Sequence, residues 1–248
     1  MKGYQIMINK LDWDSEFFGC NIASLSLVDG SSFKEVEKFI QDKDIDFIQS
    51  LCRIEDINRI RTLENNNFHF ADLKVTYSLN VEEYDDCEKA VIDLATAEDK
   101  DLICNLASNA FNDSRYYGYE QLFAKDKVDE MFTLWAEKSI NGQFDDFCLK
   151  VKEGDSILGF ITAKIHDNKK AVIGLVAVDE SYRSKGVGTS LLKSLIRYLK
   201  SLNIFEIDVS TQGKNTIAQN FYIKQGFKIK SLESWYYCHI RRNEKENY

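Results

Sequence analysis

The chain has 248 residues and a formal net charge of -8 at pH 7, with 44% hydrophobic and 29% charged residues. This length allows one large buried core or two small ones. No run of about 18 apolar residues occurs and no signal pattern opens the sequence, so we expect a cytoplasmic protein without a membrane span. The acidic charge without a basic run argues against nucleic acid as a partner and favours a substrate that carries an amine.

The cysteines and histidines form no metal-binding pattern. The six cysteines have no CxxC spacing, and the three histidines form no ligand cluster. Metal ligands of these types normally come in closely spaced pairs. We therefore expect free thiols and no bound metal. The residues are Cys20, Cys52, Cys87, Cys104, Cys148, Cys238, His69, His166 and His239.

Residues 1–92 predict a small N-terminal α/β domain. Its pattern gives the order strand, helix at 34–43, strand, helix at 54–65, and strand. The stretch LENNNFHF at 63–70 resembles YIKQGFKI at 222–229, with asparagine where the second stretch has glycine. Both residue types tolerate a left-handed backbone, which suggests a truncated internal repeat.

Residues 93–248 predict a second, larger domain. Two helices are expected first, at 97–111 and 121–139. Three strands then form an antiparallel meander, at 146–151, 156–165 and 171–178, with a turn at 153–155. A further strand at 205–209, a helix that begins at Asn215 and a pair of strands through 235–240 complete the domain.

The most informative run is VAVDESYRSKGVGTSLL at 176–192, which joins an apolar strand to an amphipathic helix. The first turn of a helix leaves backbone N–H groups unpaired at the positive end of the helix dipole. Glycines at 186 and 188 let the backbone approach a ligand closely. The loop at 183–188 therefore predicts a site for a pyrophosphate.

This loop differs from two other phosphate loops, because both GxxxxGK[ST] and the third glycine of GxGxxG are absent. Its pattern Arg-x-x-Gly-x-Gly instead resembles the coenzyme A pyrophosphate loop of the GNAT family of N-acetyltransferases. The later run NTIAQNFYIKQGF at 215–227 resembles the NxxAxxxYxxxGF motif of that family. Two motifs in the family's order make chance agreement improbable.

The resemblance implies a GNAT fold, which is an α/β fold of the α+β type with a mixed, mostly antiparallel sheet flanked by helices. It also implies acetyl-CoA as co-substrate and Tyr222 as the acid that protonates the leaving thiolate, although Tyr222 could instead only pack in the core. The smaller N-terminal unit is GNAT-like but has no glycine loop, so one cofactor site is expected. The cofactor-binding candidates are Val176, Val178, Arg183, Ser184, Lys185, Gly186, Val187, Gly188, Thr189 and Asn215.

The residue that deprotonates the amine does not follow from the motifs. The strand at 171–178 contains no carboxylate, although a glutamate there is common in the family. Asp179, Glu206 and Asp208 could act through water or could be solvated or capping residues. We predict water-mediated deprotonation.

Two weaker segments narrow the substrate. The runs LDWDSEFFG at 11–19 and FNDSRY at 111–116 resemble the TDP-fucosamine acetyltransferases, which act on the 4-amino group of a nucleotide-linked dideoxy sugar. The resemblance implies a role in surface polysaccharide or lipopolysaccharide biosynthesis, with Ser114 and Arg115 as substrate-binding candidates. Arg115 could fork onto a nucleotide diphosphate or form an ordinary ion pair.

The sequence is compatible with several alternatives. The aromatic side chains of Trp13, Phe17 and Phe18 are more often core residues, with a turn at 14–15. The chain could also acetylate a peptide or a small-molecule amine instead of a nucleotide-linked sugar such as dTDP-4-amino-4,6-dideoxygalactose, or bind acyl-CoA without catalysis. The nucleotide, the acyl length and association into a homodimer are left open.

Overall fold

A computed structural model describes residues 7–26, 33–84, 90–111, 114–119, 121–166 and 169–240. The chain divides into two compact units. Unit 1 comprises Met1–Val75, Gln212–Lys214 and Ser231–Tyr248, and unit 2 comprises Thr76–Thr211 and Asn215–Lys230. The strands β4 and β9 each contribute residues to both units. The domain boundary near residue 92 stays a prediction from the sequence.

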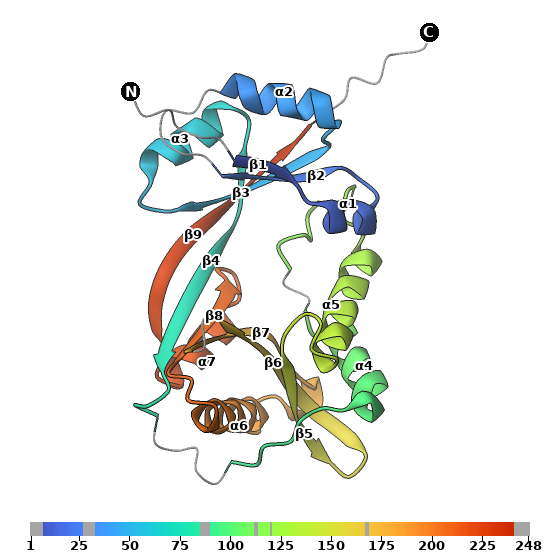
Figure 1. Cartoon of the computed structure of the whole chain (residues 1–248), viewed down its shortest axis with the longest axis vertical. Helices are drawn as coiled ribbons and strands as arrows, with labels where there is room; N and C mark the ends of the chain where they lie inside the picture. Colours follow the sequence, from blue (N-terminus) through green and yellow to red (C-terminus); the bar gives the residue numbers. More distant parts are fainter. Residues whose placement is uncertain are drawn as a thin grey trace. The chain divides into compact units, whose positions relative to one another are not determined.

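Unit 1 is a small α/β unit, drawn in blue and cyan in Figure 1 apart from β9. Strand β1 pairs antiparallel with β2, β2 pairs parallel with β3, and β3 pairs antiparallel with β9. Its elements are β1 (Met7–Lys10), α1 (Asp12–Phe18), β2 (Ile22–Ser26), α2 (Phe33–Lys43), β3 (Phe47–Arg53), α3 (Ile57–Asn65) and parts of β4 (His69–Asn80) and β9 (Lys228–His239).

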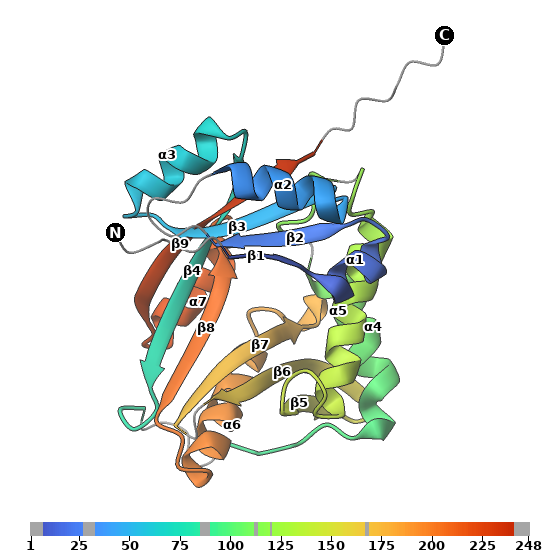
Figure 2. The same cartoon turned by 45° about the horizontal axis from the view of Figure 1, so that its top comes forward.

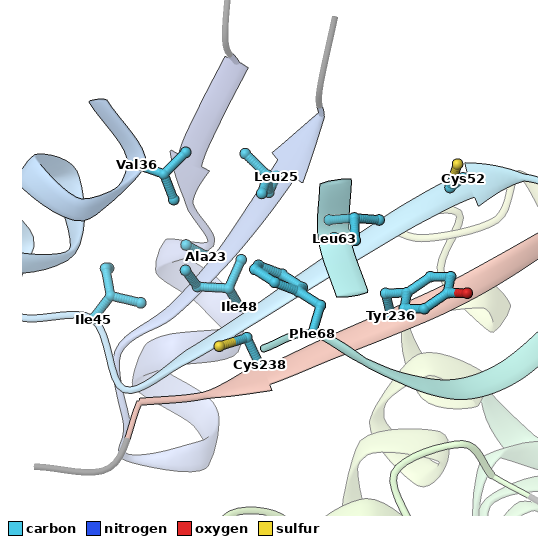
Figure 3. Close-up of a cluster of buried hydrophobic side chains, with 10 residues drawn as sticks. All are labelled: Ala23, Leu25, Val36, Ile45, Ile48, Cys52, Leu63, Phe68, Tyr236 and Cys238. Carbon is cyan, nitrogen blue, oxygen red and sulfur yellow. The ribbon is translucent and has the colours of Figure 1, made fainter. Parts of the chain in front are cut away.

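The core of unit 1 lies between its strands and the helices α2 and α3, which cover the same face of β1–β3 in Figure 2. Val36 of α2 and Leu63 of α3 are fully buried against Ile48 of β3. Figure 3 shows these side chains with Phe68 and Tyr236 in one cluster. The two helices therefore each bury one apolar stripe, as their sequence pattern predicts.

Helix α1 corrects two expectations. Trp13 is 37% exposed and stacks on Phe17 with 5.0 Å between ring centroids, so Trp13 is not a core residue. The predicted turn at 14–15 is wrong, because both residues lie inside α1. The Ser15 hydroxyl donates to Leu11 O at 2.6 Å and accepts from Ile22 N at 2.9 Å. A buried side-chain bond within the helix thus replaces the turn.

Unit 2 is built on β4, β8, β7, β6 and β5, in that order across the sheet. Strands β5, β6 and β7 pair antiparallel, which confirms the predicted meander, and β7 pairs parallel with β8. Helix α6 covers one face of these strands, and α4 and α5 cover the other (Figure 1). The elements are α4 (Lys100–Ala110), α5 (Lys125–Ile140), β5 (Phe147–Glu153), β6 (Ser156–His166), β7 (Lys170–Val178), α6 (Val187–Ser201), β8 (Glu206–Gln212) and α7 (Thr216–Lys224).

Two further differences concern the end of the chain and the cysteines. The prediction of a last pair of strands is wrong, because Lys228–His239 is one strand of 12 residues. This segment contains no glycine, proline or asparagine to turn the chain. The five described cysteines are free thiols, as expected, and Cys87 lies outside the described residues.

The similar sequence segments 63–70 and 222–229 also have similar backbone geometry. Asn67 and Gly226 both have left-handed backbones, with φ of 62° and 88°. The amide of Phe68 donates to Leu63 O at 3.0 Å, and the amide of Phe227 donates to Tyr222 O at 3.0 Å. Each unit therefore turns from a helix into a strand by the same corner.

Candidate functional site

The strands β7 and β8 separate partway along their length. Parallel pairing runs from Lys170 with Glu206 to Ile173 with Val209 and ends there. Strand β7 continues to Val178 without pairing with β8. Val176 and Val178 lie half-buried on this stretch. Its main-chain N–H and C=O groups on the β8 side can therefore bond a ligand in the manner of an added strand.

A β-bulge in β7 coincides with this separation. Ile161 of β6 pairs with Val176 and Ala163 pairs with Ile173, so two residues of β7, Gly174 and Leu175, oppose Thr162 alone. A bulge bends its strand and increases the local twist. The bend accounts for the parting of β7 from β8.

The glycine loop follows directly. Asp179 accepts from Ser181 N at 2.9 Å and so caps a short 3-10 helix, Glu180–Tyr182. Ser184 and Gly186 both have positive φ, of 62° and 88°, and α6 begins at Val187. Gly186 suits its left-handed backbone, whereas the left-handed Ser184 was not foreseen from the sequence.

The start of α6 packs closely on its neighbours. A Cβ at Gly188 would lie 3.4 Å from the Phe221 ring and 3.9 Å from Val178. The first-turn amides of Val187, Gly188 and Thr189 have no acceptor within an α-helix, so they can donate to an anion. The Thr189 hydroxyl accepts from Gln225 Nε2 at 3.2 Å.

The charged side chains of the loop are engaged locally. Arg183 lies 3.8 Å from Glu180, and both side chains are exposed. The Lys185 amine lies 4.9 Å from the centroid of the Tyr182 ring. The amides of Arg183 and Lys185 donate to Glu180 O and Tyr182 O, each at 3.3 Å, so the backbone donors left for an anion are those from Gly186 to Thr189.

A cavity of about 470 Å³ lies beside the loop in unit 2. Helix α4 lines one side of it with residues that the motifs did not indicate. The lining comprises Leu102, Asn105, Leu106, Asn109, Ala110, Ser156, Ile157, Val178, Asp179, Glu180, Ser181 and Arg183. The amphipathic pattern of α4 predicts its buried face, but no sequence signal marks the asparagines that face a cavity.

Helix α7 positions Asn215 and Tyr222. Asn215 Oδ1 accepts from Ala218 N at 3.0 Å, so Asn215 caps the helix and its Nδ2 group can donate elsewhere. Tyr222 is 5% exposed, and its ring packs among Tyr77, Phe221 and Phe227. Burial raises the pKa of the Tyr222 phenol, so the hydroxyl keeps its proton and is neutral near pH 7.

Two of the three carboxylates named as possible bases, Glu206 and Asp208, are paired with lysines. Asp208 is 6% exposed and bonds Lys170 and Lys230, and Glu206 accepts from Lys230 at 2.5 Å. Burial by itself would raise the pKa of Asp208, but these lysine bonds outweigh it and lower the pKa. Both residues lie where β7 and β8 are paired, whereas Asp179 lines the cavity and uses one carboxylate oxygen to cap the short 3-10 helix.

The two substrate candidates lie in a turn of unit 2. Ser114 is buried, and Tyr116 N donates to its hydroxyl at 3.4 Å. Arg115 donates to the Tyr116 hydroxyl at 2.8 Å, and its guanidinium lies 4.2 Å from the centroid of that ring. Neither is among the described residues that line the cavity, and residues 112–113 lie outside the described part of the chain.

Unit 1 carries no counterpart of Tyr222. At the shared helix corner, Leu63 holds the position that Tyr222 holds in unit 2, and it is fully buried. Within the described ranges, no three carboxylate, thiol or imidazole residues gather as a metal-ion site would require. None of the described helices combines the length and apolar character needed to cross a membrane.

Comparisons with known proteins agree with this geometry. A family model described as the acetyltransferase (GNAT) family matches residues 107–227, which include the glycine loop, Asn215 and Tyr222. The chain is 25% identical to the dTDP-fucosamine acetyltransferase of Escherichia coli O6:H1 over 232 residues, which cover 93% of this chain and 97% of that relative. It is 28% identical to the spore coat polysaccharide biosynthesis protein SpsD of Bacillus subtilis over 142 residues, or 57% of this chain and 47% of the relative, about half its length.

A solved structure of similar fold is the GCN5-related N-acetyltransferase from Sphaerobacter thermophilus. The two structures have a TM-score of 0.65 at 16% identity, with 96% of this chain and 77% of that chain covered. Identity at this level bears on the fold alone. The fold expected from the two sequence motifs is thereby confirmed.

Proposed function

This chain carries an acetyltransferase domain of the GNAT family, and on that premise we propose that it transfers the acetyl group of acetyl-CoA to the amino group of a nucleotide-linked amino sugar. The acceptor class is dTDP-4-amino-4,6-dideoxygalactose and similar sugars. The choice of acceptor rests on the similarity to a dTDP-fucosamine acetyltransferase. This similarity extends over 93% of this chain and not only over the domain that all such enzymes share.

We place the cofactor site where β7 and β8 cease to pair, beyond Ile173 and Val209. Acetyltransferases of this family use acetyl-CoA. The main-chain groups of Val176 and Val178 would bond the pantetheine arm, since β8 does not pair with them. The amides from Gly186 to Thr189 would bind the pyrophosphate, since those of Arg183 and Lys185 already donate to Glu180 O and Tyr182 O, and the Asn215 side-chain amide would add a donor. This assignment uses the one stretch of β7 edge that the sheet leaves unpaired.

The reaction is direct transfer in which a C–N bond forms and the thioester C–S bond breaks. The neutral amine attacks the thioester carbonyl carbon, and N–H groups near Val178 stabilise the charge that develops on the oxygen. Tyr222 donates its phenolic proton to the leaving sulfur. Water removes the proton that the amine loses and returns a proton to the phenolate, so the enzyme is restored.

In the acceptor site, we propose that Ser114 and Arg115 bind the nucleotide diphosphate. A guanidinium presents planar donors that match phosphate oxygens. In the free chain Arg115 stacks on Tyr116, which holds the group in a defined orientation. Arg115→Lys keeps the charge but loses the fork, and it should raise the KM for the nucleotide sugar while the KM for acetyl-CoA stays unchanged.

The test is thiol release from acetyl-CoA with the purified protein and a set of amines. The set contains dTDP-4-amino-4,6-dideoxygalactose, a UDP-amino sugar and a lysine peptide. Turnover confined to the nucleotide sugars supports the proposal. Turnover of the peptide alone, or tight acetyl-CoA binding without turnover of any amine, would reject the sugar acceptor and leave only the cofactor site.

A further inference from the structure

We propose that Asp145 is a positioning residue of the acetyl-CoA site, which acts through Thr162 to hold the bulge where β7 leaves β8. The inference rests on the proposed function, because it concerns the same stretch of β7. Asp145 lies in the turn that connects α5 to β5, far from the two cofactor motifs in the sequence. Neither the motifs nor the strand composition points to it.

A directed chain of hydrogen bonds links the bulge to this carboxylate. Leu175 N can only donate, so the Thr162 hydroxyl accepts its proton at 2.8 Å. The hydroxyl has one proton of its own and donates it to Asp145 Oδ2 at 2.5 Å. Bonds in such a chain polarise one another, and a charged acceptor strengthens the first link.

The side chains that form this series of hydrogen bonds are buried. Asp145 is 4% exposed, and both Thr162 and Ser139 are fully buried. Ser139 supports the carboxylate from α5, because its hydroxyl lies 3.4 Å from Asp145 Oδ2 and accepts from Asp145 N at 3.4 Å. A buried carboxylate is costly to keep for stability alone, which favours a specific structural task for it.

Gly174 gives an independent sign of the same arrangement. A Cβ at this position would overlap the Asp145 carboxylate, with Cγ only 2.8 Å away. Its φ is not among the positive values of the chain, so backbone conformation does not require glycine there. Position 174 therefore requires glycine because the Asp145 carboxylate occupies the space that a Cβ would need.

The bulge matters because it sets which groups of β7 meet the cofactor. The extra residue leaves the Leu175 amide outside the regular ladder with β6, and the Thr162 hydroxyl provides its acceptor. Without that acceptor the unpaired amide favours a regular register. A slip of one residue would turn Val176 and Val178 to the opposite faces and redirect their main-chain groups.

Three variants test the proposal by different routes. Thr162→Val removes the acceptor, Asp145→Asn removes the charge, and Gly174→Ala displaces the carboxylate by steric overlap. Each should weaken acetyl-CoA binding by roughly 10- to 100-fold, measured by calorimetry, and raise the KM for acetyl-CoA while kcat changes little. Thr162→Ser keeps the hydroxyl and should restore wild-type affinity.

Asp146→Asn is the matched control, because it makes the same chemical change one residue along. The Asp146 carboxylate accepts from Ile165 N and takes no part in the bulge. Melting scans identify the variants that fold. The proposal is overturned if folded Thr162→Val and Gly174→Ala bind acetyl-CoA like the wild type, if kcat falls at unchanged KM, if Asp146→Asn weakens binding equally, or if all three variants fail to fold.

These outcomes separate the inference from the proposed function. Calorimetry with acetyl-CoA needs no acceptor, so a wrong amino sugar would not affect it. If the wild type does not bind acetyl-CoA at all, the cofactor assignment fails and the role of Asp145 fails with it.

Discussion

Ile173 of β7 and Val209 of β8 are the last two residues that pair between these strands, and Val178 ends β7 five residues beyond Ile173. The unpaired stretch leads directly into the glycine loop and α6. Strand edge, loop amides and helix start therefore follow one another along a short piece of chain. This continuity is what makes an extended ligand with a pyrophosphate a good fit for the site.

The Tyr222 hydroxyl is expected to act as the acid. Tyr222→Phe should lower kcat by roughly 10² or more, because the thiolate would leave without a positioned proton donor. The affinity for acetyl-CoA should stay nearly unchanged, since the ring keeps its packing against Phe227. Steady-state kinetics and calorimetry check the two halves of this prediction.

Tyr77→Phe is the control for that variant. Tyr77 lies next to Tyr222, with 6.0 Å between ring centroids, and its hydroxyl donates to Gln219 Oε1 at 3.1 Å. Its loss should cost about 1 kcal/mol of stability and leave kcat unchanged. An equal loss of kcat in both variants, or little loss in Tyr222→Phe, would return Tyr222 to a packing role.

The backbone at Gly186 is expected to matter for cofactor affinity. Gly186→Ala forces a Cβ onto a residue with φ of 88°, at a strain of about 1–2 kcal/mol, and the loop should relax away from its binding geometry. We expect weaker acetyl-CoA binding by calorimetry. Gly154→Ala places similar strain, at φ of 58°, in the turn between β5 and β6, and should lower the melting temperature without changing that affinity.

Asn215 is expected to have two separable roles. Asn215→Ala removes the helix cap and should cost about 1 kcal/mol of stability. Asn215→Asp keeps an oxygen that can cap Ala218 N but removes the amide donor, so it should weaken acetyl-CoA binding at wild-type stability. If Asn215→Asp binds acetyl-CoA as tightly as the wild type, the side chain is a cap and nothing more.

Asp208 should stabilise the fold in a pH-dependent way. Its lysine bonds lower its pKa in the folded state, so the stabilisation is fully present above the unfolded pKa of about 4 and is lost as the pH falls through the folded value. Asp208→Asn should therefore lose about 1–3 kcal/mol in urea unfolding at pH 7, and the difference from the wild type should shrink in acid.

The same variant tests whether Asp208 is a base. Because Asp208 lies on the paired part of β8 and bonds Lys170 and Lys230, kcat of the folded variant should match the wild type. A large fall in kcat at unchanged melting temperature would contradict the structural assignment and restore Asp208 as a catalytic candidate.

The parts of the site that were predictable are local in sequence. The glycine loop and the start of α6 lie on consecutive residues, so their spacing alone indicates an anion site. The cap at Asn215 and the left-handed Gly226 likewise depend on neighbours only. For the same reason, the similarity between the helix-to-strand corner at Asn67 and the one at Gly226 can be found in the sequence.

The parts that were not predictable depend on residues that meet only in the fold. Asp145 reaches Gly174 across β6, and no spacing rule connects them. The exposure of Trp13 depends on which face of the short helix α1 is covered, which composition does not show. Glu206 and Asp208 read as available acids until their lysine partners are known.

A comparison of two acceptors that differ only in the nucleotide tests the proposed acceptor class. Initial rates of thiol release from acetyl-CoA are measured with dTDP-4-amino-4,6-dideoxygalactose and with the free amino sugar, and the product is analysed for an acetyl group on the amino nitrogen. We expect N-acetylation with a much higher kcat/KM for the nucleotide-linked sugar. Equal rates for the two sugars, or no acetylation of either while acetyl-CoA binds, would contradict it.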